Sequence, residues 1–77
     1  MSKEKIQEVV LKSLKEYFSV LDGQKPTNVY GMVMHIVEKP VLVAVMEKAK
    51  NNQSLAAEML GINRNTLRKK LLEHELL

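Results

Sequence analysis

The chain has 77 residues, a net charge of +3 and no cysteine, so it offers neither a disulfide nor a thiolate metal site. A single domain of this size buries only about 60–65% of its unfolded surface and is marginally stable alone. The longest uninterrupted apolar run, Val41 to Met46, has six residues and is too short to span a bilayer. Acids interspersed near the start argue against a signal peptide. We therefore expect one soluble cytoplasmic domain without a membrane segment.

A first helix is predicted from Lys3 to Leu21. Apolar residues recur there at helical spacing, while lysine and glutamate occupy the other face. Ser2 is a candidate N-cap, and Asp22-Gly23 followed by Pro26 ends the helix. The apolar face consists of Ile6, Val9, Val10, Leu14, Tyr17, Phe18 and Leu21.

A second helix is predicted from the residue after Asn28 to about Lys50, and it is apolar on almost every side. Pro40 has no backbone N–H to donate to the Ile36 carbonyl, and this missing hydrogen bond predicts a kink. A buried strand over residues 41–46 is the alternative, because that stretch is rich in β-branched residues. No second strand candidate exists for it to pair with, so the helix is favoured.

The second helix needs more cover than one chain supplies. A helix that is apolar all round must be covered on nearly every side, and the remaining helices are too small for that. The simplest additional cover is a second copy of the chain. We therefore predict an all-α fold of four helices, in which residues 1–50 form an intertwined dimeric four-helix core. Residues 51–77 form a helix-turn-helix DNA-binding segment of the same single domain.

The helix-turn-helix is predicted from a short helix, Gln53 to Leu60, and a second helix, Asn63 to Leu72. Ala57 is small enough for a close crossing, and Gly61 can adopt the left-handed conformation that ends a helix. Asn63 is a good N-cap. The shared core and corner are expected to come from Leu60, Ile62, Leu67 and Leu71.

The positive charge is concentrated in this second short helix. Residues 1–62 hold eight Lys or Arg and seven Asp or Glu, whereas residues 63–70 hold four basic residues and no acid. A basic face is often merely solvated. Combined with the turn signals, however, a helix that carries the charge excess indicates phosphate contact and DNA binding. The surface set is Arg64, Asn65, Arg68 and Lys69, with Lys70 on the flank.

These residues resemble the Fis family of bacterial nucleoid-associated DNA-bending proteins, and the Fis-type output domain that ends many enhancer-binding activators. The resemblance covers essentially the whole chain. It implies an all-α homodimer whose two recognition helices lie closer together than one turn of straight DNA, so that the protein bends its sites with loose sequence preference. The matching elements are Asp22-Gly23-Gln24, Pro40, Asn51-Asn52-Gln53-Ser54, Gly61-Ile62-Asn63-Arg64 and Thr66-Leu67-Arg68-Lys69-Lys70.

The resemblance also implies roles for individual residues. Arginine can pair with guanine edges, whereas short amide and hydroxyl groups at helix starts suit phosphate oxygens. Base contacts are expected from Asn63, Arg64 and Arg68. Phosphate contacts are expected from Asn52, Gln53, Ser54, Thr66, Lys69 and Lys70. The chain departs from the well-known members at Asn65, Leu55 and Leu72-Glu73, which leaves flanking DNA contacts open.

Other signals do not indicate a separate site. His35 and Glu38 could be half of a metal site, but two ligands are too few, and a locally bonded interface histidine is the ordinary interpretation. His74 is expected to be a frayed, solvated residue. Nothing suggests catalysis, a cofactor or a bound metal, so an enzyme is not expected. Met32, Met34, Met46 and Met59 are expected to fill gaps in the core.

Three functions remain open from the sequence. The first is a free-standing nucleoid-associated protein and transcription regulator that acts as a homodimer on double-stranded DNA, with RNA polymerase as a candidate further partner. The second is the output domain of a larger enhancer-binding activator. The third is a pure dimerisation or protein-interaction module. Met1 directly before the first helix favours the first, and contact with DNA-inversion recombinases is not expected because the N-terminal arm used for it is absent.

Overall fold

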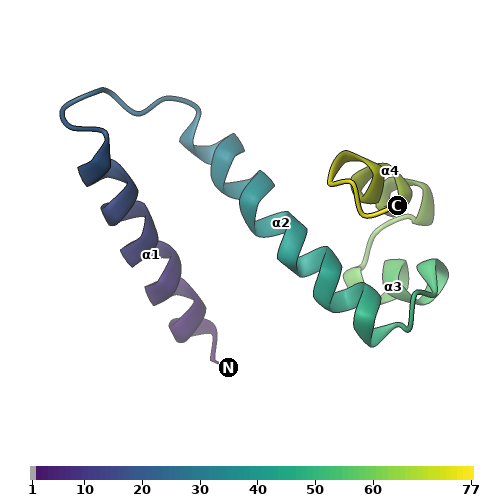
Figure 1. Ribbon diagram of the computed structural model, residues 1–77. Coiled ribbons are helices and arrows are strands. Elements are labelled where there is room, and N and C mark those ends of the chain that lie inside the picture. Colours follow the sequence, from purple (N-terminus) through teal and green to yellow (C-terminus); the bar gives the residue numbers. More distant parts are fainter. Residues whose placement is uncertain (1) are drawn as a thin grey trace.

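The computed structural model describes residues 2–77, which form four helices and no strand. These are α1 (Lys3–Val20), α2 (Val29–Lys48), α3 (Gln53–Leu60) and α4 (Arg64–Glu73). α1 and α2 form a hairpin with diverging arms, and α3 and α4 gather beside the far part of α2 (Figure 1). The predicted all-α fold of four helices is confirmed.

The ends of α1 follow from its flanking residues. The Ser2 hydroxyl accepts a hydrogen bond from the Lys5 backbone N–H at 3.2 Å, which confirms the predicted N-cap. The helix ends at Val20, one residue earlier than predicted. Asp22 and Gly23 then adopt positive φ angles of 51° and 84°, which no helix can continue.

α2 is a single helix that runs through Pro40 without interruption. It includes residues 41–46, so the strand alternative is wrong for this stretch. It ends at Lys48, two residues before the predicted end, because Lys50 and Asn51 take left-handed conformations with φ of 53° and 64°. The predicted kink at Pro40 remains a prediction.

α2 is also long and apolar enough to cross a membrane. Its 20 residues have a mean hydropathy of 1.5 in their most apolar window. The uninterrupted run of six apolar residues underestimates the length of the apolar segment, because it leaves out the apolar residues on either side. The core helix of a soluble protein passes the same test. Only Leu42 is buried in this helix, so most of its apolar surface remains uncovered within one chain.

The buried core lies where α3 and α4 meet the second half of α2. It combines large leucines with small alanines, and the small residues allow the short helices to approach closely. Leu67 and Leu71 are fully buried and Ala57 nearly so, as predicted, whereas Leu60 and Ile62 are half-buried around them. The buried residues are Leu42, Ala49, Ala56, Ala57, Leu67 and Leu71.

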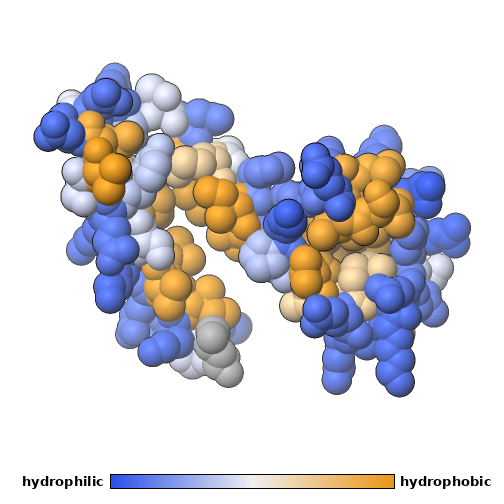
Figure 2. Space-filling model, viewed as in Figure 1, coloured by the Kyte–Doolittle hydropathy of each residue, from blue (hydrophilic) through white to orange (hydrophobic). Residues whose placement is uncertain are grey.

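The α1–α2 hairpin, by contrast, has almost no core of its own. No residue of α1 is buried. Figure 2 shows hydrophobic residues of both helices on the outside of the molecule. Between the arms lies an open apolar groove of about 320 Å³, lined by Val9, Val10, Ser13, Leu14, Tyr17, Met32, Val33, Ile36 and Val37.

The methionines expected to fill the core divide into two groups. Met46 packs against the buried core and Met32 lines the groove. Met34 and Met59 are about half exposed, at 48% and 46%. Their role as core residues therefore depends on cover from outside this chain.

Candidate nucleic-acid interface

The turn between α3 and α4 is built by two backbone hydrogen bonds. The Ile62 N–H donates to the Ala57 carbonyl at 3.0 Å, and the Gly61 N–H donates to the Glu58 carbonyl at 3.1 Å. Gly61 has a φ of 73°, the left-handed conformation that this helix ending requires. The sequence predicts this residue and this conformation, and the structure confirms both.

Asparagines cap both short helices. The Asn52 side-chain oxygen accepts from the Leu55 N–H at 3.1 Å, and the Asn63 oxygen accepts from the Asn65 N–H at 2.7 Å. Each cap uses the amide oxygen and leaves the amide NH₂ free to donate. Capping is thus compatible with the predicted DNA contacts of Asn52 and Asn63, because phosphates and the major-groove edges of purines offer acceptors.

The first turn of α4 lies beside the first turn of α3. The Arg64 guanidinium donates to the Ser54 hydroxyl at 3.4 Å, which joins a predicted base-contacting residue to a predicted phosphate-contacting residue. Arg68 follows Arg64 by four residues and therefore shares its helix face. Both arginines are exposed, so the two guanidinium groups are available to one ligand.

The other predicted contacts also lie at the surface of this unit. Thr66 and Lys69 are exposed and Gln53 is half-buried. Figure 2 shows hydrophilic residues along the edges of the lobe that contains α3 and α4, around a hydrophobic patch on the visible face. Because residues 63–70 contain no acid, a phosphate backbone approaching the exposed side of α4 meets no repelling charge from this segment.

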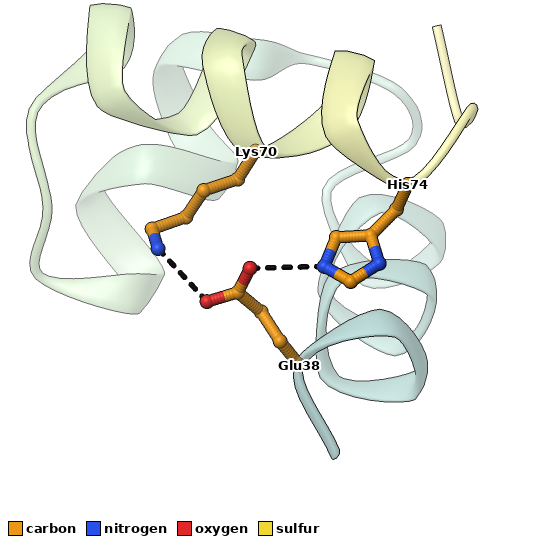
Figure 3. A network of polar contacts seen from close by, with 3 residues as sticks. All are labelled: Glu38, Lys70 and His74. Atoms are coloured by element: carbon orange, nitrogen blue, oxygen red, sulfur yellow. Dashed lines mark hydrogen bonds and ion pairs between the residues drawn. The ribbon is translucent and has the colours of Figure 1, made fainter. Parts of the chain in front are cut away.

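Lys70 is different from the other basic residues of α4. Its ammonium donates to Oε2 of Glu38 on α2 at 2.8 Å, and its side chain is only 32% exposed (Figure 3). This hydrogen bond raises the pKa of Lys70. The same bond, followed by one from His74, lowers the pKa of Glu38. The structure thus places the Lys70 charge on a carboxylate of its own chain.

The expectation of a frayed, solvated His74 is wrong. The residue is only 4% exposed, and its Nε2 lies 2.9 Å from Oε1 of Glu38. Because a carboxylate only accepts, Nε2 carries the proton in this pair. The sequence holds a signal for this burial: His74 follows Leu67 by seven residues and Leu71 by three, so it continues the buried stripe of α4.

His35 completes this polar cluster. Its ring stacks on that of His74 with centroids 4.4 Å apart and planes inclined by 23°. Sequence reasoning places His35 and Glu38 together on one helix but misses their partners, since these come from residues more than thirty positions away. Within residues 2–77, no group of three His, Cys, Asp or Glu could hold a metal ion.

Comparisons with known proteins agree with this geometry. Residues 34–74 match the model of the family described as bacterial regulatory protein, Fis family. The chain belongs to the Fis family. It is 57% identical over 77 residues to a Fis-like DNA-binding protein of Ralstonia nicotianae, with all of both chains covered.

Two further relatives place the chain within the Fis family at lower identity. A Fis-like DNA-binding protein of Neisseria meningitidis is 56% identical over 72 residues, which cover 94% of this chain and 91% of the relative. The DNA-binding protein Fis of Actinobacillus succinogenes is 48% identical over 69 residues, which cover 90% of this chain and 70% of the relative. The family resemblance expected from the sequence is therefore confirmed.

Proposed function

We propose that this chain is a homodimeric, nucleoid-associated protein that binds and bends DNA and regulates transcription. The observation that carries the proposal is the exposed face of α4, where Arg64 and Arg68 lie four residues apart with no acid between them and Arg64 reaches the start of α3. The names of its relatives as DNA-binding proteins support the same interpretation. Such a face suits insertion into the major groove.

The proposed contacts divide between base edges and phosphates. Asn63, Arg64 and Arg68 contact base edges, because they occupy the cap and the exposed face of the first two turns of α4. Phosphate contacts come from donors at the start of α3, where helix N-termini favour anions, and from the exposed side of α4. The phosphate-contacting residues are Asn52, Gln53, Ser54, Thr66 and Lys69. The charge of Lys70 already has a partner in Glu38.

The proposed dimer rests on the surface that one chain leaves uncovered. Ile36 is 61% exposed on α2 and Val9 is 54% exposed on α1, and both line the open groove between the arms. A second copy offers the same apolar faces, so a symmetric pair covers both at once. The four helices then form a bundle of the kind that buries such faces.

Bending is proposed from the arrangement of the two recognition helices that the family resemblance implies. Two α4 helices closer than one turn of straight DNA enter adjacent major grooves only if the DNA curves toward the protein. Sites with a narrow, compressible central minor groove should therefore bind best. The proposed function needs no catalysis and no cofactor, and its setting is the nucleoid of the bacterial cytoplasm, where RNA polymerase is a candidate partner.

A salt titration tests the proposal. The full chain is titrated onto a duplex with an A-tract centre and onto a random duplex at several salt concentrations. Arg64, Arg68 and Lys69 bring six cationic groups per dimer close to the DNA, and if each displaces about one counterion, the slope of log K against log salt should be near −5. Tighter binding to the duplex with the compressible centre is also expected. A slope shallower than about −2, or equal affinity for the two centres, contradicts the proposed mode of binding.

A further inference from the structure

His35, Glu38, Lys70 and His74 form a polar group that we call the Glu38 cluster. It joins α2 to the end of α4, which otherwise meet through apolar contacts. Each carboxylate oxygen of Glu38 holds one group from the end of α4: Oε2 the Lys70 ammonium at 2.8 Å, and Oε1 the His74 imidazole at 2.9 Å (Figure 3). The His74 side chain is 1% exposed, and the ring of His35 covers it. The contact is thus directional, with a buried imidazole on one carboxylate oxygen and a partly exposed ammonium on the other.

The position of the cluster relative to Pro40 gives it a mechanical consequence. α3 and α4 pack on Leu42 and Ala49, which follow Pro40, whereas Glu38 and His35 precede it. Proline lacks the N–H that would bond to Ile36, so α2 is easiest to bend at this point. The cluster therefore connects α4 to the part of α2 that lies on the other side of its weakest turn.

The hydrogen bond between Lys70 and Glu38 also makes Lys70 less available to DNA than the other basic residues of α4. Its ammonium already has a charge-assisted hydrogen bond to Glu38, so a phosphate can take it only by breaking that bond. Breaking it also leaves the carboxylate with one partner fewer. Arg64, Arg68 and Lys69 form no ion pair among the residues described, so they can contact DNA without this cost.

We propose that Glu38 is a positioning residue for DNA recognition: by holding Lys70 and His74 it fixes the angle of α4 on the N-terminal half of α2 and withholds Lys70 from phosphate. The inference rests on the proposed DNA-binding dimer. In that dimer the N-terminal half of α2 belongs to the shared core, so the cluster in each protomer sets the separation of the two recognition helices.

The test compares Glu38→Ala with Glu47→Ala. Both substitutions remove one negative charge from α2, but Glu47 is exposed and makes no ion pair among the described residues, so it controls for net charge. The probes are the best duplex selected by the wild-type chain from a random pool, and versions with one base pair added or removed at its centre. The readout is the ratio of affinities for the selected and altered spacings.

The wild type and Glu47→Ala are expected to give the same ratio, whereas Glu38→Ala lowers it by about fivefold or more, because α4 can adopt a range of angles. Glu38→Gln keeps the shape of the side chain and one acceptor oxygen, so its ratio should fall between those of the wild type and Glu38→Ala. If Glu38→Ala does not fold, Glu38→Gln takes its place in the test. An unchanged ratio in the folded Glu38 variant overturns the positioning role.

Lys70 gives a second readout. Lys70→Ala alone should leave the salt slope of the wild type unchanged, while Glu38→Ala should steepen it by about 2 per dimer as two ammonium groups become free. Adding Lys70→Ala to Glu38→Ala should restore the wild-type slope. A slope flattened by about 2 in Lys70→Ala alone overturns the withholding of Lys70. A wild-type chain that fails to bind any duplex overturns the proposed function, and this inference with it.

Discussion

The two halves of this molecule treat their apolar residues differently. Residues 42–76 bury a compact core in which Leu67 and Leu71 of α4 pack together with residues of α3 and the second half of α2. The α1–α2 hairpin buries nothing in α1 and leaves Ile36 and Val9 more than half exposed. One part has a buried core within the chain, and the other leaves its apolar faces largely uncovered.

This difference assigns separate tasks to the two halves. The helix-turn-helix needs a rigid surface that presents Arg64 and Arg68 in fixed geometry, and local packing supplies it. In the proposed dimer, a second copy covers the apolar surface of the hairpin, and burying that surface contributes favourable free energy. Folding of the hairpin and association should therefore occur together.

The largest expected effect comes from placing a charge in the uncovered groove. Ile36→Glu should abolish the proposed dimer at micromolar concentration, since an uncompensated buried charge costs about 3–5 kcal/mol and a symmetric interface contains it twice. Sedimentation and circular dichroism at several concentrations measure this. The wild-type denaturation midpoint should rise with protein concentration.

Leu11→Glu is the matched control for that experiment. Leu11 is similarly exposed, at 56%, but lies among the charged residues Glu8, Lys12 and Glu16 on the outer face of α1. It should change stability by about 0.5 kcal/mol or less. A wild-type midpoint independent of concentration, or a folded monomeric wild-type chain at micromolar concentration, would break the contrast between the two halves.

The next effect concerns the half with its own core. Leu67→Ala should lower the free energy of unfolding by about 2–5 kcal/mol, because it opens a cavity in a fully buried site. Leu72→Ala, at a side chain that is 52% exposed, is the control and should cost far less. Urea unfolding of both variants at one protein concentration makes the comparison. Equal losses would show that α4 is not packed as described.

A smaller effect separates base contacts from phosphate contacts on α4. Arg64→Ala should lower affinity for the best site by about 1–3 kcal/mol while affecting random duplex much less, because its guanidinium can discriminate guanine. Lys69→Ala should weaken both complexes by similar factors and flatten the salt slope by about 1–2 per dimer. Paired titrations on specific and random DNA measure both variants. Equal losses on the two DNAs for Arg64→Ala would reduce its role to electrostatics.

The smallest expected effect is the pH dependence of the Glu38 cluster. Hydrogen bonds from Lys70 and then His74 hold the pKa of Glu38 below its ordinary value of 4.5. The stabilisation is therefore fully present above pH 4.5 and is lost as pH falls through the lower, folded-state pKa. Because the pair is partly exposed, it should amount to about 0.2–1 kcal/mol.

Unfolding of the wild type and Glu38→Gln from about pH 3 to pH 7 checks this. Their difference in free energy should be constant above pH 4.5 and shrink at acid pH, where the wild-type carboxyl becomes neutral. A difference that stays unchanged in acid would argue that the carboxylate charge does not hold the cluster together. At the basic end, the pKa of Lys70 is raised above its ordinary value of 10.5. The stability that Lys70 contributes is therefore fully present below pH 10.5 and is lost as pH rises through the folded-state pKa.

Much of the fold can be predicted from local sequence. Ser2 and Asn63 cap the helices that their positions predict, and Gly61 takes its predicted left-handed conformation. These features depend on residues within a few positions of one another, so composition and spacing suffice to predict them. The exposed Arg64 and Arg68 follow from the same helical period, although their contacts with DNA stay predictions.

The tertiary structure alone decided which polar groups pair across the chain. Glu38, Lys70 and His74 come together because α4 folds back onto α2. Lys70 and His74 follow Glu38 by 32 and 36 positions, and contacts over such separations leave no periodic pattern in the sequence. The same packing buries His74, which local reasoning places in solvent. Local hydrogen bonds and helical periodicity thus determined the elements of this protein, whereas the apposition of distant faces determined which of its charges remain free.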